Sequence, residues 1–412
     1  MGLANRNFVM LADPATIRYW SVYCCRYRVI KYVPFFGLGQ LVGAAAGLRR
    51  GTALYSTKGS AMAKQAQRTG LTLIEFLVVV VIIAVIIGML LPATRRVREA
   101  SRRTVCKNNL RQLGIALHAY ASDHERFPMG VGVSDQDGVV QAQPLSGVVS
   151  LLPYIEMNAL YDEISQPMTI ADVDYPAFGA ALDDSNYLPW KTQTDALICP
   201  TSSHSDGSDW GRTSYGFSIG DVARNVSQQE TLRGPFGYFK AIGFDDVTDG
   251  ISNTVFMLEV GNGMPQAIKG GCLADGKADW LDNPKQTFTA IEDGKYLSEA
   301  NLIDRGSHWA DGRAGVGLIN TILPVNSPSF QVQDSPTGDG IYSAGSNHTN
   351  GCNVVLLDAS TQFVSEEIDT GESSVATLTI EQMAENIPSP HGVWGALGTI
   401  ASGDDAEHDD FR

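Results

Sequence analysis

The feature that most constrains this chain is an apolar stretch from Gly70 to Leu91. Among the residues after Gly70, only Thr72 and Glu75 are clearly polar. A helix rising about 1.5 Å per residue carries such a stretch across a hydrocarbon core of about 30 Å. Lipid cannot hydrogen-bond an open backbone, so the segment must be helical despite its many Val and Ile residues. We therefore predict a transmembrane helix over residues 71–91.

Glu75 is the unusual residue of this span, because a carboxylate in lipid is costly and needs a partner. One interpretation is that Glu75 lies near the membrane surface and snorkels. Another is that a cation on a neighbouring subunit pairs with it, since opposite charges attract strongly where the dielectric constant is low. The carboxylate by itself leaves both interpretations open.

The residues around Glu75 favour the second interpretation. Lys64 and Arg68 precede Gly70, and Leu-Thr-Leu-Ile-Glu and the apolar run follow it. This arrangement resembles the processing site of type IV prepilins and type II secretion pseudopilins, with Leu71 where that family more often has Phe. The resemblance implies that a prepilin peptidase cuts between Gly70 and Leu71 and methylates the new amino terminus. It also implies that Glu75 pairs with the α-amino group of another pilin-like subunit.

The start of the chain is interpreted with the same resemblance. Residues 1–61 show no sustained hydrophobic period and do not read as a domain. Met62 opens a basic segment, residues 62–70, whose length is typical of prepilin leaders. We interpret Met62 as the true start and residues 1–61 as an over-extended N-terminus; a genuine long leader is the alternative. In either case these residues should not shape the mature fold.

Charge is distributed unevenly along the chain. The formal net charge is −15, yet residues 1–70 contain ten of the 30 basic residues and one of the 45 acidic ones. The strongly acidic remainder argues against nucleic acid as a partner. A basic cluster nevertheless follows the span, and by the positive-inside rule it favours a cytoplasmic head. Its members are Arg95, Arg96, Arg98, Arg102, Arg103, Lys107 and Arg111.

The processing motif points the other way, because a prepilin leader stays in the cytoplasm. We follow this motif, which is longer and more specific than the charge pattern. The expected location is the cytoplasmic (inner) membrane, crossed once, with the head on the extracytoplasmic side. Membrane lipid, the prepilin peptidase and other pilin-like subunits are the expected partners.

Beyond the span the same helix is predicted to continue over residues 92–126. Pro92 should kink it, because proline lacks the N–H that bonds back one turn. Pro128 follows the periodic region closely, so we expect the helix to end near Glu125. The apolar positions between step by four, three, four and three residues and share one face. They are Cys106, Leu110, Leu113, Leu117 and Tyr120.

Residues 127–370 predict a β-rich head, since Gly, Pro, Asp, Asn and Ser interrupt short apolar runs. We expect a helical segment at 151–161, buried strands at 196–200 and 253–259, and a hairpin over 352–364. Residues 262–345 show little periodicity and are interpreted as an insertion, and 371–412 form a C-terminal segment with an acidic tail. The predicted fold class is α+β and pilin-like, a long N-terminal helix packed on a loop-rich, mainly antiparallel head.

Four cysteines follow the predicted cut. In an exported head they could form one or two disulfides, with three possible full pairings. Their wide spacing and the lack of a CxxC motif argue against a structural zinc site. We predict no metal and no cofactor. The four candidates for disulfides are Cys106, Cys199, Cys272 and Cys352.

A second resemblance covers nearly all of residues 71–412. His348 and Asp358, ten apart, resemble the H-X9-DG signature of the bacterial DUF1559 proteins, which carry a prepilin-type N-terminus. Ala359 replaces the glycine of that signature, which implies strain if the turn needs a positive φ. Phe330 stands where relatives often have cysteine, which removes a possible disulfide partner. The other matching segments are residues 106–120, 126–128, 151–155, 199–200, 247–254 with Glu259, and 393–397.

His348 and Asp358 invite a catalytic or metal-binding interpretation. They flank a hairpin, however, and a histidine–carboxylate hydrogen bond that locks this corner explains them as well; we favour that structural role. No GxSxG, HExxH or P-loop motif is present. We therefore do not expect an enzyme.

Two other polar clusters were weighed. Residues His308, Trp309, Asp311 and Gly312 could line a pocket, although Asp-Gly is more often a simple turn. A trio of carboxylates could bind calcium but does not fit the EF-hand spacing; its members are Asp245, Asp246 and Asp249.

The sequence as a whole indicates a membrane-anchored, pseudopilin-like structural subunit or accessory of a type II secretion or type IV pilus-like assembly. The alternative is a cell-surface ligand-binding protein that uses the helix only as an anchor. In that case the regions around His308 and His348 would line the ligand site.

Overall fold

The computed structural model describes residues 72–135, 138–140, 143–179, 181–202, 210–228, 232–261, 265–297, 301–335 and 337–403. The predicted extension 1–61, the leader 62–70, the two cleavage residues Gly70 and Leu71, and the acidic tail after Gly403 lie outside the described residues.

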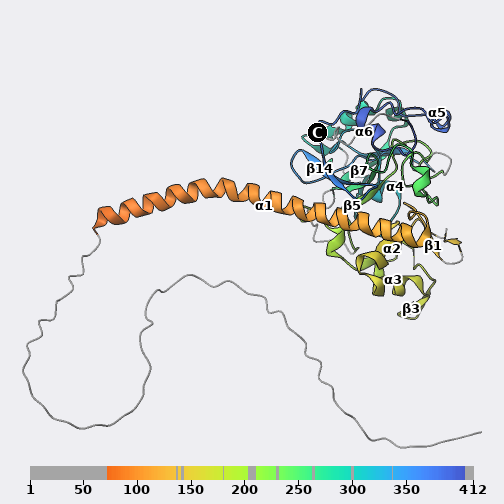
Figure 1. Ribbon diagram of the computed structural model, residues 1–412, viewed down its shortest axis with the longest axis horizontal. Helices are drawn as coiled ribbons and strands as arrows, with labels where there is room; N and C mark the ends of the chain where they lie inside the picture. The colour runs from red at the N-terminus through yellow and green to blue at the C-terminus, as the bar shows by residue number, and fades with distance from the viewer. Residues whose placement is uncertain are drawn as a thin grey trace, which may run out of the picture. The chain divides into compact units, whose positions relative to one another are not determined.

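One helix, α1 (Leu73–His124), dominates the N-terminal part of the described chain (Figure 1). Thr72 caps its start: the Glu75 N–H donates to the Thr72 hydroxyl, and the Glu75 carboxylate accepts from the Thr72 N–H at 2.8 Å. The helix continues through Pro92, so the expected kink does not interrupt it. It ends where expected, with Glu125 in the left-handed region at a φ of 58°.

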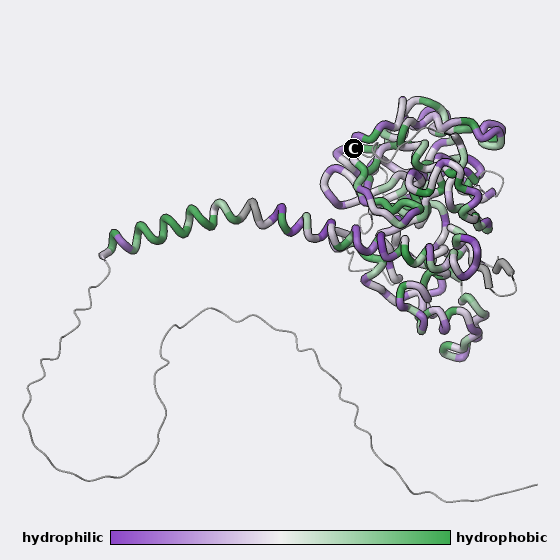
Figure 2. Tube along the Cα trace, viewed as in Figure 1, coloured by the Kyte–Doolittle hydropathy of each residue, from purple (hydrophilic) through white to green (hydrophobic). Residues whose placement is uncertain are grey.

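The two halves of α1 have different surroundings (Figure 2). The first half contains an 18-residue window with a mean hydropathy of 3.2, none of it buried, and the helix is long and apolar enough to cross a membrane. In the second half the predicted stripe is buried: Cys106, Leu110, Leu113 and Leu117 are fully enclosed and Tyr120 is 6% exposed. Burial of each such side chain contributes about 1.5–3 kcal/mol.

The buried stripe packs on a five-stranded sheet, mainly against β14, β6 and β15. Most neighbours in this sheet are antiparallel, and β11 pairs with β5 in parallel at one edge. A Cβ on Gly114 would lie 2.9 Å from Val355 Cγ2, so glycine permits the close approach of helix and sheet. The strand order is β11 (Leu318–Ile319), β5 (Tyr215–Ser218), β6 (Val255–Glu259), β14 (Gly351–Leu356) and β15 (Thr361–Ser365).

A second sheet has four strands, with β12 parallel to β7 and the other pairs antiparallel. Its order is β10 (Leu302–Asp304), β7 (Gly271–Gly276), β12 (Phe330–Val332) and β13 (Gly340–Ile341). Among the described residues, three small hairpins complete the strands: β1 (Val133–Asp135) with β2 (Gly138–Val140), β3 (Met168–Ile170) with β4 (Val173–Tyr175), and β8 (Ile291–Glu292) with β9 (Lys295–Tyr296).

Short helices occupy the connections. The segment expected at 151–161 forms three of them: α2 (Val148–Leu151), the 3-10 helix η1 (Leu152–Ile155) and α3 (Asn158–Ser165). The remaining α-helices are α4 (Ala314–Gly317), α5 (Ile380–Ala384) and α6 (Gly392–Ala396). Further 3-10 helices are η2 (Leu188–Lys191), η3 (Asp195–Leu197), η5 (Phe244–Asp246), η6 (Ala278–Leu281) and η7 (Pro284–Ala290).

The predicted α+β, pilin-like class is confirmed, and so are the buried strand β6 and the hairpin of β14 and β15. Two details were wrong. Residues 196–200 form the end of η3 and an extended turn rather than a strand, because Pro200 follows at once and a proline cannot donate to a sheet. Residues 262–345 are not a separable insertion, since β11 belongs to the main sheet. The strands β7, β10, β12 and β13 build the second sheet, and β8 and β9 form a hairpin of their own.

Candidate functional site

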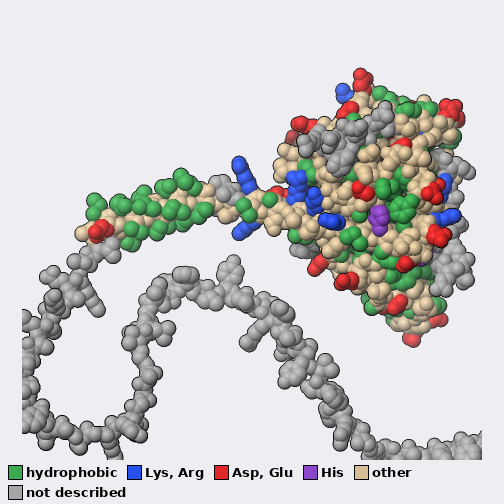
Figure 3. Space-filling view, in the orientation of Figure 1, with side chains coloured by type: hydrophobic (Ala, Val, Ile, Leu, Met, Phe, Trp, Pro, Cys, Tyr) green, Lys and Arg blue, Asp and Glu red, His purple; other side chains and the backbone are tan. Residues whose placement is uncertain are grey.

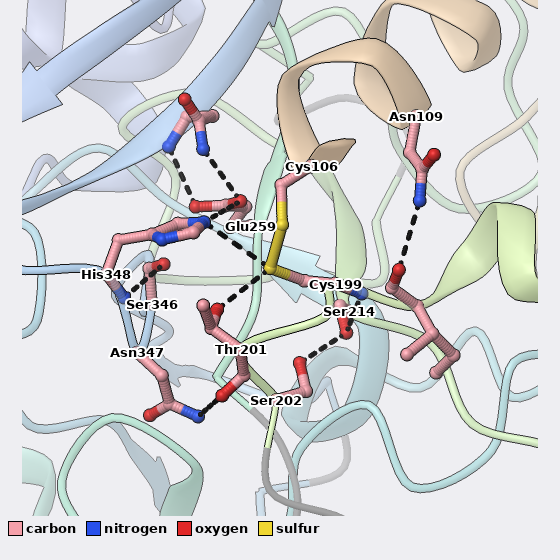
Figure 4. Close-up of a disulfide and its surroundings, with 12 residues drawn as sticks. Cys106, Asn109, Cys199, Thr201, Ser202, Ser214, Glu259, Ser346, Asn347 and His348 are labelled. Atoms are coloured by element: carbon pink, nitrogen blue, oxygen red, sulfur yellow. Dashed lines mark hydrogen bonds and ion pairs between the residues drawn. A yellow bond between two sulfur atoms is a disulfide. The ribbon is translucent and has the colours of Figure 1, made fainter. Parts of the chain in front are cut away.

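The site lies where the second half of α1 meets the head, around a disulfide between Cys106 and Cys199 (Figure 4). The bond joins α1 to the segment that follows η3, 93 residues further along the chain, with the two Cα atoms 5.0 Å apart. Cys106 is on the buried stripe, and the Cys199 backbone N–H donates to Ser214 Oγ at 3.0 Å. Helix and head are therefore covalently connected at this point.

His348 stands beside the disulfide and contacts two carboxylates. Its Nδ1 lies 2.7 Å from Glu99 Oε1, which comes from α1. Its Nε2 lies 3.4 Å from Glu259 Oε1 at the end of β6 and 3.4 Å from Cys199 Sγ. We call the five residues Glu99, Cys106, Cys199, Glu259 and His348 the latch.

Four residues of the latch are buried, whereas the side chain of Glu99 is 36% exposed. His348 is 1% exposed and Glu259 is 1% exposed. Burial alone would lower the pKa of His348, but the carboxylates of Glu259 and Glu99 together raise the pKa above its ordinary value. A protonated His348 then forms ion pairs toward both α1 and β6. Asn353 fixes Glu259 by donating its backbone N–H to Oε2 at 2.8 Å and its Nδ2 to Oε1 at 2.9 Å.

Other polar side chains on the same face of α1 extend this connection. Arg103 stacks on the ring of Phe363, with the guanidinium carbon 3.3 Å from the ring centroid. Asn109 Nδ2 donates to the carbonyl of Ile198 at 3.0 Å, one residue before the disulfide. One face of α1 carries all of these contacts, because the residues follow the helical period at positions 99, 103, 106, 109, 113 and 117. Along this face the charged contacts come first, then the disulfide, then the buried apolar side chains.

The structure separates the predicted site residues. Cys106 and Cys199 pair, while Cys272 and Cys352 are free and buried. The proposed lock between His348 and Asp358 was wrong: β14 lies between them, and the carboxylate partners of His348 are Glu99 and Glu259. Asp358 instead accepts from the Ser360 N–H at 2.8 Å within the turn of the hairpin.

The two departures from the family pattern have structural consequences. Ala359 has a φ of 63°, so the turn does place an L-residue in the region that favours glycine. Phe330 is fully buried in β12 and pairs with Leu273, the neighbour of the free Cys272.

The residues around His308 are enclosed by aromatic rings. His308 is 4% exposed; its ring stacks on Trp210 at 5.0 Å between centroids and meets Trp190 edge-on at 5.9 Å. Trp309 donates its indole N–H to the carbonyl of Thr192 at 2.9 Å. Burial lowers the pKa of His308 to about 4, so the imidazole is neutral at pH 7. We call His308, Trp190, Trp210 and Trp309 the aromatic cluster.

The remaining carboxylates of interest serve local structure. The Asp311 carboxylate forms an ion pair with Arg313 at 2.5 Å, and Asp246 accepts from the Gly243 N–H at 2.7 Å. Asp249 accepts from the N–H groups of Ser402 and Gly403, which ties the C-terminal segment to the head. The sequence offered three aspartates, at 245, 246 and 249, as a weak calcium candidate without the EF-hand spacing. Within the described part of the chain they do not form a group close enough to share an ion.

Sequence reasoning missed Glu99 entirely and gave no role to Glu259. Glu99 lies seven residues before Cys106, two helical turns along the same face, which is the signal that could have found it. Glu259 ends a strand that was expected to be buried, and a carboxylate in such a place needs a partner. The partner itself could not be read from the sequence.

Comparison with known proteins agrees with this architecture. The family described as "Protein of unknown function (DUF1559)" matches residues 95–371, which is more than half of the chain. The chain belongs to this family. It is also similar to the competence protein ComGC of Halalkalibacterium halodurans, at 28% identity over 74 residues, which are 18% of this chain and 72% of that protein. No solved structure matches the chain.

Proposed function

We propose that this DUF1559 protein is a membrane-anchored, pseudopilin-like structural subunit or accessory of a type II secretion or type IV pilus-like assembly. The observation that carries the proposal is the division of α1: an exposed apolar half long enough to cross a membrane continues into a half that forms part of the core of the head. The similarity to a competence protein fits this role. The proposed role is structural, and we assign no catalytic activity.

The proposal includes processing by a prepilin peptidase between Gly70 and Leu71, followed by methylation. It places the head on the extracytoplasmic side of the inner membrane. The disulfide of the latch supports this location, because such bonds persist in oxidising compartments. Lys and Arg side chains gather on α1 just past its hydrophobic stretch (Figure 3), where they can contact lipid headgroups.

Intact mass and N-terminal sequencing of protein recovered from its native membrane test the processing step. A chain that begins at N-methylated Leu71 is the expected result. A chain that begins at Met62 or Met1 would mean an uncleaved anchor and would contradict the pseudopilin-like role.

Glu75 allows a sharper test of assembly, because it has a partner in its own chain. Its carboxylate accepts from the Thr72 N–H and hydroxyl at 2.8 and 2.9 Å, a capping box that glutamine can also close. Glu75→Gln therefore keeps the cap and removes the charge. If a neighbouring α-amino group pairs with Glu75, Glu75→Gln is processed but fails to co-assemble with partner subunits.

Thr72→Ala is the matched control, since it removes the capping hydroxyl and keeps the carboxylate. It should co-assemble as the unmodified chain does. Normal incorporation of Glu75→Gln, measured by crosslinking to partner subunits in membranes, would show that Glu75 acts only as a helix cap.

A second candidate function is ligand binding at the cell surface. The regions around His308 and His348, where the sequence placed such a site, are buried, but a hollow of about 860 Å³ opens elsewhere on the head. It is lined by Asn283, Lys285, Gln286, Phe288, Glu372 and Ser373, among others. A ligand for this hollow should raise the melting temperature of the full chain in detergent, and Phe288→Ala should abolish that rise.

A further inference from the structure

We propose that the latch binds one zinc ion when the bond between Cys106 and Cys199 is reduced. The ligands would be the two thiolates, Nε2 of His348 and a carboxylate oxygen of Glu259. One ligand atom from each residue already lies within 4.8 Å of the other three, and all four residues are buried. Two sulfurs, one imidazole and one carboxylate form a donor set that zinc accepts.

The distances fit a tetrahedral ion. Bonds of about 2.3 Å to sulfur and about 2.0 Å to nitrogen or oxygen place ligand atoms roughly 3.3–3.8 Å from one another. His348 Nε2 lies 3.4 Å from Cys199 Sγ and 3.4 Å from Glu259 Oε1, so two of these separations exist before any metal enters. The two sulfur atoms are nearer only because they are bonded, and reduction frees them to move apart.

The surroundings of the ligands resemble the outer shell of a metal centre. A histidine ligand usually donates its second ring N–H to a carboxylate, which fixes the tautomer that leaves the other nitrogen free for the metal. Glu99 stands in that position, 2.7 Å from His348 Nδ1. Asn353 orients both oxygens of Glu259 in the same manner. These contacts fix the orientation of His348 and Glu259.

The redox step is simple. A dithiol reductant gives two electrons and two protons to the disulfide; the bond between the sulfur atoms breaks, and the reductant forms its own disulfide. Each thiol then releases its proton as it binds zinc. The ion connects the same two segments, so one cross-link between α1 and the head replaces another. This inference is independent of the assembly role.

The test uses the full chain in detergent, a phosphine reductant and Co²⁺ as a spectroscopic probe. The phosphine becomes a phosphine oxide, takes its oxygen from water and leaves both thiols free. We expect the reduced chain to bind one Co²⁺, with the strong near-ultraviolet absorption of thiolate-to-cobalt charge transfer and the visible bands of tetrahedral cobalt. Zn²⁺ should displace it, and the oxidised chain should show neither signal.

Three variants assign the signal. The double variant Cys106→Ser/Cys199→Ser removes both thiolates and should abolish the charge-transfer band. Cys272→Ser, which alters a buried free cysteine outside the latch, should retain it. Glu99→Gln keeps all four ligands but weakens the support of His348, and should lower the affinity for Co²⁺ about 10- to 100-fold. Near-ultraviolet circular dichroism of each reduced variant shows that the head is folded.

The proposal would be overturned by a reduced, folded chain that binds no Co²⁺, by a charge-transfer band that persists in the double variant Cys106→Ser/Cys199→Ser, or by equal binding by the oxidised chain. Loss of the native circular dichroism spectrum on reduction, even with Zn²⁺ present, would also overturn it, because the site requires the folded head to bring its ligands together. None of these results depends on processing or assembly.

Discussion

The latch and the aromatic cluster each bury a histidine, but they shift its pKa in opposite directions. His348 is enclosed beside a disulfide, and the carboxylates of Glu259 and Glu99 raise its pKa against the effect of burial and give it charged partners on two elements. His308 is enclosed by tryptophans, and burial lowers its pKa to about 4. Burial alone therefore does not define a functional site. What distinguishes the latch is that its partners come from α1 and from the head.

The largest expected effect comes from the aromatic cluster. Trp309 is 1% exposed and packs edge-on against Trp190, so Trp309→Ala should lower the free energy of unfolding by about 3–5 kcal/mol. Urea unfolding of the full chain in detergent, followed by circular dichroism, measures it. The control is Phe288→Ala, whose ring is 44% exposed and whose loss should matter by about 0.5 kcal/mol or less. Equal effects would show that the cluster is not a packing centre.

The latch should respond less to loss of its covalent bond. Cys106→Ser opens a loop of 93 residues and should lower the free energy of unfolding by about 2–4 kcal/mol. The unmodified chain with reductant and chelator should fall to the same value. If reduction leaves stability unchanged under these conditions, the disulfide does not hold α1 to the head.

The pH dependence of stability on the acid side tests the environment of His308. Its folded pKa of about 4 is below that of a free histidine, about 6.5, so the unfolded chain binds the proton first as pH falls. The contribution of neutral His308 to the free energy of unfolding is therefore complete above pH 6.5. It is lost as the pH falls toward 4, by at most about 3 kcal/mol. Burial also lowers the pKa of His391 to about 4, so His308→Phe should reduce this acid dependence, without abolishing it, in urea titrations at several pH values. An unchanged slope in that variant would mean that the ring is hydrated.

His348 should give the opposite slope. Its folded pKa is raised, so its contribution is complete below the pKa of a free histidine and is lost as pH rises through the folded value. His348→Gln should remove the loss on the alkaline side and leave the acid limb that belongs to His308 and His391. The same titrations measure both, and parallel slopes for the two histidines would contradict the environments described here.

The smallest expected effect lies at the turn after β14. Ala359 has a φ of 63°, and removing its Cβ relieves backbone strain of about 1–2 kcal/mol. Glycine loses more conformational entropy on folding, which offsets about 0.5–1 kcal/mol of this gain. Ala359→Gly should therefore stabilise the head by up to about 1 kcal/mol. A melting-temperature shift of a few degrees upward is the readout. A decrease would show that the methyl group of Ala359 contributes more to packing than the backbone strain costs.

The fold was predictable wherever one periodic pattern decided the outcome. The stripe from Cys106 to Tyr120 predicted the buried face of α1, and the apolar run before it predicted the exposed half. The strand β6 and the final hairpin followed from short apolar runs with turn residues. The segment 262–345 was misread because its short strands pair with partners far away in the sequence, which leaves little local pattern.

The sequence by itself determined that the long helix is apolar on all sides in its first part and on one side in its second part. Both patterns depend on the polarity of residues that are neighbours along the helix, so they can be read locally. Only the tertiary structure decided which cysteine bonds to Cys106 and which carboxylates contact His348. Cys106, Cys199, Glu259 and His348 are far apart along the chain, and their chemistry arises only when α1, β6 and the loop before β14 exclude water from one place. The fold brings these side chains together and excludes water from around them, and both effects are properties of the whole fold.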